Sequence, residues 1–148
     1  MDEQACYFNS SATIDDGSCD YFDCQGVCAG DNGIRLNNNG SIWYNIDVPI
    51  YGFQFDIEGE DIEMINIENI IYNDLLDNSC IYTDNTNYDC RIKFMIFNID
   101  GTPLFENSSG RLLKLSEDID GLDIYLKDIF ISGFKGEILE FDNLNDCP

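Results

Sequence analysis

Cysteine and aspartate are the residues whose chemistry and spacing stand out in this chain, and histidine is missing altogether. Zinc sites usually present paired Cys-x2-4-Cys knuckles, and only Cys24 and Cys28 come close to that spacing. Seven cysteines in 148 residues are instead typical of an oxidising compartment. We therefore expect disulfides rather than a metal knuckle from the cysteines, which are Cys6, Cys19, Cys24, Cys28, Cys80, Cys90 and Cys147.

The positions of the cysteines suggest pairings but do not decide them. A bridge between Cys6 and Cys19 would close a turn-rich loop, and one between Cys80 and Cys90 would join the ends of a polar loop. Cys147 is the odd cysteine by position. It could join Cys24 or Cys28 and so tie the tail to the head of the chain, or it could pair between chains.

The acidic side chains set the electrostatics of the protein. With 29 Asp and Glu against 7 Lys and Arg, the net charge of −22 repels nucleic acid and anionic membrane surfaces. Cations are the natural counterpart, and calcium prefers the oxygen ligands of Asp-rich turns. Two clusters could bind calcium or simply face water, although neither fits the EF-hand loop: Asp15, Asp16, Asp20, Asp23 and Asp31 in the head, and Asp118, Asp120 and Asp123 further on.

The same composition argues against catalysis. Without histidine there is no Ser-His-Asp triad and no Cys-His dyad, and no spacing singles out a carboxylate pair for glycoside cleavage. We expect no enzyme. No apolar segment follows Met1, and no run reaches the roughly 18 residues needed to span a bilayer. This pattern predicts one of two situations. Either Met1 stands where a signal peptide has been replaced, or the protein is oxidised after assembly, as on a virion.

The segment Val48–Gly59 is the element around which we expect the fold to be organised. Its side chains alternate, because Gln54, Asp56 and Glu58 fall on one phase and apolar residues on the other. Such a strand must be covered by a second layer. The apolar phase consists of Tyr51, Phe53, Phe55 and Ile57.

Short apolar runs separated by Gly, Asn and Asp turns follow along the chain and predict further strands. Residues 62–76 are ambiguous; we favour a strand pair, or one strand plus a short turn, because Ile is abundant and good helix formers are few. The count of eight or nine strands predicts an all-β jelly-roll β-sandwich over residues 34–148, after a disulfide-stapled head over residues 1–33. The other predicted strands lie at residues 42–46, 91–99, 104–105, 112–115, 124–131 and 138–141.

The head resembles a known kind of repeat. The stretches Asp15-Asp16-Gly17-Ser18-Cys19 and Asp23-Cys24-Gln25-Gly26-Val27-Cys28-Ala29-Gly30-Asp31 are similar to Cys-rich repeats of large surface proteins from marine bacteria and some large DNA viruses. Those repeats often carry a further upstream cysteine, which is missing here.

The remainder resembles cohesin-like domains, through Trp43-Tyr44, the run 49–57, Arg91-Ile92-Lys93-Phe94 and the run 110–115. The resemblance implies a nine-stranded jelly roll that serves as a protein-binding or spacer module. Cohesins bind dockerins through one sheet face, but no dockerin-contacting residue can be matched here.

These observations predict a non-enzymatic structural or adhesion module on a cell or virion surface. Its partner would be another protein or further copies of itself, without nucleic acid or membrane insertion. The alternative is a carbohydrate-binding or carbohydrate-cleaving sandwich, which would need exposed aromatic rings in a row. The rings that could form that row are Trp43, Tyr44, Tyr82 and Tyr88.

Overall fold

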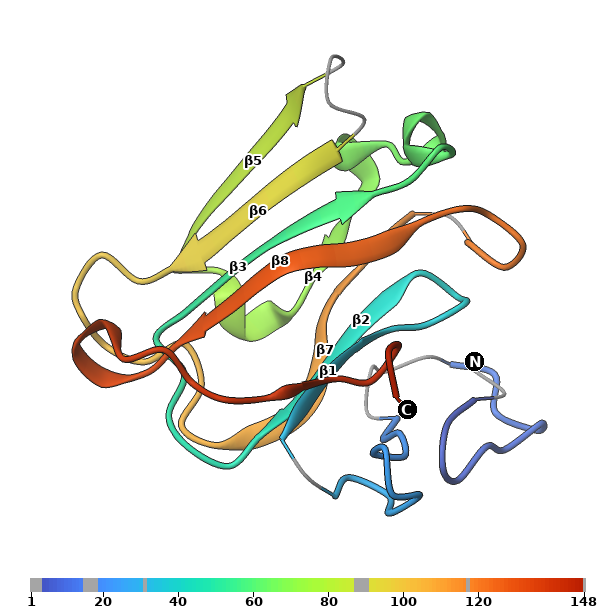
Figure 1. Cartoon of the computed structure of the whole chain (residues 1–148), viewed down its shortest axis with the longest axis horizontal. Helices are drawn as coiled ribbons and strands as arrows, with labels where there is room; N and C mark the ends of the chain where they lie inside the picture. Colours follow the sequence, from blue (N-terminus) through green and yellow to red (C-terminus); the bar gives the residue numbers. More distant parts are fainter. Residues whose placement is uncertain (1–3, 15–18, 31, 87–90, 117, 148) are drawn as a thin grey trace.

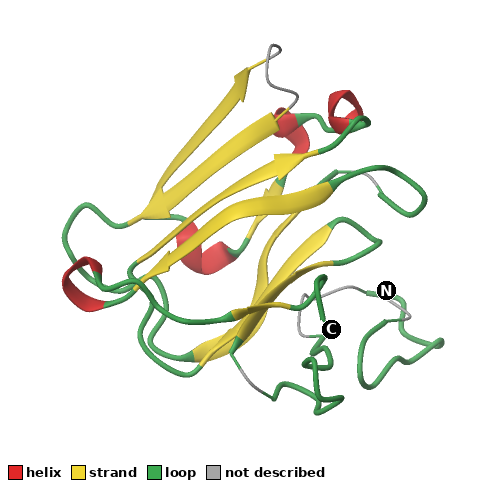
Figure 2. Ribbon diagram, viewed as in Figure 1, coloured by secondary structure: helices red, strands yellow, loops and turns green. Residues whose placement is uncertain are grey.

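The computed structural model describes residues 4–14, 19–30, 32–86, 91–116 and 118–147. They form two facing β-sheets, one of five strands in the order β4-β7-β2-β1-β9 and one of four in the order β5-β6-β3-β8 (Figures 1 and 2). This architecture confirms the predicted all-β sandwich. The strands are β1 (Gly33–Leu36), β2 (Ser41–Ile46), β3 (Gly52–Glu58), β4 (Ile71–Tyr72), β5 (Cys80–Thr86), β6 (Arg91–Phe97), β7 (Ser108–Lys114), β8 (Tyr125–Ser132) and β9 (Asp142–Asn143).

Strand β3 lies inside the four-stranded sheet, between β6 and β8, and its apolar phase faces the other sheet. Phe53, Phe55 and Ile57 are at most 2% exposed, as the alternation predicts. Phe55 lies directly opposite Phe94 of β6, and their rings stack with centroids 5.1 Å apart. The predicted organising strand therefore supplies the centre of the core.

Four predicted elements differ from the structure. The strand predicted at 104–105 is reduced to a single bridge between Phe105 and Ile50. Residues 62–76 form mainly 3-10 turns, η1 (Ile62–Met64), η2 (Ile67–Asn69) and η3 (Asp74–Leu76), around the two-residue β4. Asn66 and Asn73 start two of these turns by accepting backbone N–H groups, which favours a turn over the predicted strand pair. The predicted polar loop after Cys80 begins as strand β5, because it pairs along the whole of β6.

The predicted strand at 138–141 is reduced to a single bridge between Ile138 and Ser132, after the turn η4 (Phe134–Gly136). The chain then continues to β9, which pairs in parallel with β1. The Asn145 side chain accepts from the Leu36 N–H at 2.8 Å and donates to its carbonyl at 2.7 Å. The C-terminal segment is thus attached to β1 by backbone-like hydrogen bonds.

The cysteines pair differently from the nearest-neighbour expectation. Cys6 is bonded to Cys28, so the bridge to Cys19 is wrong. The reason is that Cys6 donates its N–H to the Asp20 carbonyl, while residues 21–22 lie beside residues 28–29. Residues 20–22 therefore bring Cys6 and Cys28 together. Cys147 is bonded to Cys24, one of its two predicted partners within the chain.

Cys80 has no disulfide partner among the described residues, and the other half of its predicted bridge, Cys90, lies outside them. No described helical turn is long and apolar enough to cross a membrane.

Candidate functional site

The outer face of the five-stranded sheet is covered by residues of the head. Trp43 of β2 points away from the sandwich core, yet it is only 1% exposed. Tyr21 packs edge-on against it with ring centroids 5.4 Å apart, and Ala5 and Leu144 complete this small cluster. Both chain ends lie beside this sheet (Figure 1). The broad open sheet face is therefore the outer face of β5-β6-β3-β8.

One end of that open face is apolar. Tyr82, Phe97, Phe130 and Ile138 are between 38% and 62% exposed there. They lie around or beside a hollow of about 500 Å³ that Gly52 helps to line. A Cβ atom at Gly52 would come within 2.8 Å of the Ser132 hydroxyl, so a glycine keeps the hollow open. Exposed aromatic side chains around a concave surface are typical of a protein interaction site.

A β-bulge in β8 places two different side chains on the open face. Phe130 is opposite Gln54, whereas Lys127 is opposite Asp56, so β8 has one residue more than β3 over this stretch. In regular strands residues three apart would point to opposite faces. The extra residue removes that alternation, and Asp128 accommodates it with a positive φ of 49°.

The other end of the face is charged and internally paired. Asp56 is fully buried although it belongs to the outward phase of β3. The Lys93 ammonium lies 2.8 Å from its Oδ1, and the Arg91 guanidinium lies 3.4 Å from its Oδ2. Lys127 lies 3.6 Å from the Glu58 carboxylate. The cations fold over Asp56 and exclude water from it, which explains its burial.

These pairs make the open face nearly neutral in a strongly acidic protein. Three of the seven basic residues, Arg91, Lys93 and Lys127, lie at this end. Its four acids are Asp56, Glu58, Asp84 and Asp128, so the local charge is 3 − 4 = −1, against −22 for the whole chain. A neutral, partly apolar surface costs less to desolvate than an unpaired acidic one.

Three of these acids could also bind a metal ion. One carboxylate oxygen from each of Asp56, Glu58 and Asp128 lies within 4.8 Å of the others. Oxygen ligands in such a group suit a hard cation. The same carboxylates of Asp56 and Glu58 already contact Lys93 and Lys127, and these cations compete with a metal for them.

Where they are described, the aspartates predicted to bind calcium make hydrogen bonds. Asp20 accepts a hydrogen bond from the Ser109 hydroxyl at 2.8 Å. Asp23 is buried and accepts the N–H groups of Gln25 and Val27, which closes a turn. Asp15, Asp16 and Asp31 lie outside the described residues.

In the second predicted cluster, Asp118 accepts the N–H of Asp120 at 2.9 Å. Asp123 joins a different segment, because its carboxylate accepts the Glu60 N–H and its own N–H donates to Asp61. These bonds are those of turn residues.

The aromatic row that a sugar-binding face would need is not formed by the predicted rings. Trp43 and Tyr44 are each 1% exposed, and Tyr88 lies outside the described residues. Tyr82 is exposed, but it lies on the open face beside Met95.

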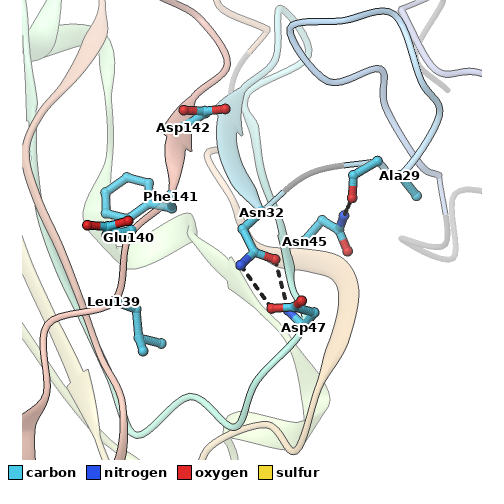
Figure 3. Close-up of a pocket in the computed structure, with 9 residues that line it drawn as sticks. Ala29, Asn32, Asn45, Asp47, Leu139, Glu140, Phe141 and Asp142 are labelled. Carbon is cyan, nitrogen blue, oxygen red and sulfur yellow. Dashed lines mark hydrogen bonds between the residues drawn. The ribbon is translucent and has the colours of Figure 1, made fainter.

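A second hollow, of about 810 Å³, lies between the head and the C-terminal segment (Figure 3). The Asn32 amide donates to the Asp47 carboxylate at 2.9 Å and accepts the Asp47 N–H at 3.1 Å. The Asn45 amide donates to the Gly30 carbonyl at 3.0 Å. These bonds join the residues before β1 to β2, and the mostly polar and acidic lining offers little apolar area to a partner.

Comparison with known proteins is informative only at the level of structure. No family model matches the chain, and no curated protein matches it significantly. Among solved structures, a non-cellulosomal cohesin from the hyperthermophilic archaeon Archaeoglobus fulgidus superimposes with a TM-score of 0.57 and 13% identity, over 77% of this chain and 86% of that chain. The fold of this protein is cohesin-like.

Two further structures are similar at lower scores. The CaDoc0917–CaCohA2 complex has a TM-score of 0.47 and 12% identity over 74% of this chain and 91% of that chain. The type II cohesin A11 from Bacteroides cellulosolvens has a TM-score of 0.43 and 13% identity over 75% and 91%. The cohesin-like assignment depends on the archaeal structure and on the two-sheet sandwich itself.

Sequence reasoning missed the apolar end of the open face. A signal was present in β6, where Met95 and Phe97 share a phase with Arg91 and Lys93. Apolar residues on the charged phase of an amphipathic strand indicate an exposed patch. No such signal existed in β8, because the bulge changes which residues share a face.

Proposed function

We propose that this chain is a non-enzymatic protein-binding module that works outside the cell, on a cell surface or on a virion. The outer face of β5-β6-β3-β8 is its docking surface. The single observation that carries this proposal is the set of exposed apolar side chains Tyr82, Phe97, Phe130 and Ile138 on a sheet face that nothing else in the described chain covers. By fold-level analogy alone, the cohesin-like fold favours a binding role over catalysis.

The electrostatics favour a different protein as the partner over a second copy. Two molecules of charge −22 repel each other at moderate ionic strength, even when their docking faces are nearly neutral. A partner with an apolar centre and a basic rim would bury the patch and gain from the surrounding acidic field. The disulfides Cys6–Cys28 and Cys24–Cys147 support an oxidising location for such an assembly.

Affinity capture with matched variants tests the docking surface. The wild-type protein, a face variant (Phe97→Ser with Phe130→Ser) and a control variant (Leu75→Ser with Ile71→Ser) are immobilised and exposed to surface extract of the source cells. The control residues are 72% and 52% exposed, and they belong to η3 and to β4 of the other sheet. We expect the wild type and the control to retain the same protein and the face variant to lose it.

The retained protein is then purified and titrated calorimetrically against all three forms. A loss of affinity of roughly tenfold or more in the face variant alone is expected for two half-buried anchors. Equal affinity of the face variant and the wild type would refute the docking surface.

We propose calcium as the cation for the acidic side chains, either in the head or at Asp56, Glu58 and Asp128. Millimolar calcium should raise the melting temperature and a chelator should lower it, because an ion that binds only the folded state stabilises it. Asp20→Asn and Asp128→Asn distinguish the two locations by removing the shift. An unchanged melt with calcium and with chelator would exclude both.

A further inference from the structure

Residues from both ends of the chain bury one aromatic side chain on the outer face of the five-stranded sheet. Trp43 lies in register between Arg35 of β1 and Arg111 of β7. Tyr21 packs against its ring, and the Arg35 guanidinium lies 5.6 Å from the Tyr21 centroid. We call the described residues 4–30 and 142–147 the cover.

The buried apolar contact between the cover and Trp43 is small. Among the described residues, Ala5, Tyr21 and Leu144 are buried against Trp43, and Cys19 and Cys24 are partly buried beside them. The Trp43 indole N–H has no hydrogen-bond partner among the described residues, and an unpaired buried donor is unfavourable. Hydrogen bonds also join the head to the rest of the chain. The Gln4 side chain accepts the Asn38 N–H, Asp20 accepts from the Ser109 hydroxyl, and the Gly30 carbonyl accepts from the Asn45 amide.

Charge opposes the cover as well. Residues 1–33 contain seven acids and no Lys or Arg, so they carry −7 of the −22. The remaining residues therefore carry −22 + 7 = −15, so the net charges of the two parts repel each other, although Arg35 and Arg111 beside Trp43 attract the acidic head locally. Such a contact needs a further restraint to stay closed.

The disulfides supply that restraint unequally. Cys6–Cys28 lies within the head, whereas Cys24–Cys147 joins the head to the segment after β9 across 123 residues of sequence. β9 pairs with β1 over two residues, and the Leu144 N–H and the Asn145 side chain add hydrogen bonds to Ile34 and Leu36. Cys147 is exposed and Cys24 is half-buried, so a reductant can reach the bond.

We propose that Cys24–Cys147 is a redox-sensitive clasp whose reduction releases the cover and exposes Trp43 while the sandwich stays folded. A dithiol reductant supplies two electrons and two protons. The S–S bond breaks, two cysteine thiols form, and the reductant becomes a disulfide. Release uncovers the row Arg35-Trp43-Arg111, which combines an aromatic ring with two guanidinium groups on an otherwise acidic molecule.

Trp43 is the single tryptophan of the chain, so its fluorescence reports the state of the cover directly. In the oxidised wild type we expect blue-shifted emission and weak quenching by acrylamide. Dithiothreitol should shift the emission to longer wavelength and raise the quenching constant severalfold, with an unchanged far-ultraviolet circular dichroism spectrum.

Variants assign the effect to one bond. Cys24→Ser with Cys147→Ser should behave like the reduced wild type without any reductant. Cys6→Ser with Cys28→Ser should keep Trp43 shielded until dithiothreitol is added. The proposal is overturned if Trp43 stays shielded in the reduced wild type, or if reduction unfolds the sandwich together with the cover.

Discussion

Replacing Phe55 by alanine tests the central physical claim, that the apolar phase of β3 holds the two sheets together. Phe55 is fully buried and stacks on Phe94 from the neighbouring strand. Truncating a buried Phe costs about 3–5 kcal/mol, from lost transfer free energy and from the cavity that remains. A chain of 148 residues has a total stability of roughly 7–22 kcal/mol, so the loss is a large fraction of it.

The matched control is Phe130→Ala, on the open face of the same sheet. Phe130 is 48% exposed, so its truncation removes only part of a side chain's burial, about 1 kcal/mol. Urea unfolding of the oxidised proteins, followed by circular dichroism, measures both free energies. A double-mutant cycle with Phe94→Ala should give a coupling of about 0.5–1.5 kcal/mol for the stacked pair.

Comparable losses from Phe55→Ala and Phe130→Ala would refute the assignment of Phe55 to the core and of Phe130 to the open face. A loss below about 1 kcal/mol at Phe55 would show that the core does not depend on this strand.

Three further predictions follow from the charges and the buried phenol. Asp56→Ala should lower the free energy of unfolding by about 2–3 kcal/mol, less than for a fully buried pair because Lys93 and Arg91 remain 27% and 35% exposed; an unchanged urea midpoint would contradict this. Raising NaCl from about 0.01 to 0.5 M should raise the melting temperature, since salt screens the self-repulsion of a −22 chain; a fall would mean that ion pairs outweigh repulsion. Burial raises the pKa of Tyr44 above its ordinary 10.0, against a smaller opposing effect of its hydrogen bond with Ser108. The folded state therefore holds the phenol proton more tightly, and this stability is present below about pH 10 and lost as pH rises through the folded pKa. Tyr44→Phe should remove that alkaline loss in urea melts between about pH 9 and 11, and an identical pH profile would refute the assignment.

Much of the fold was predictable because strand alternation is a local property of the sequence. The phases of β3 and β6 can be read directly, and they place Phe55 and Phe94 in the core and Lys93 outside. The turns at 62–76 were not predictable from Ile content, since two Asn side chains that bond to the backbone outweigh the strand propensity of Ile.

The candidate docking face was only half predictable. The alternation of β3 assigns Asp56 to the outside, but its complete burial depends on Lys93 and Arg91 from a neighbouring strand. Phe130 reaches the same face as Lys127 only because of the bulge in β8, and register between strands is not encoded in either strand alone.

By itself, the sequence determined that this protein is a two-layer β structure with disulfides, since alternation, turn residues and cysteine content are local or compositional properties. Only the tertiary structure decided which cysteines pair, why Trp43 is buried outside the main core, and which sheet face stays open. These features depend on contacts between segments as distant as Cys24 and Cys147, which no local pattern specifies.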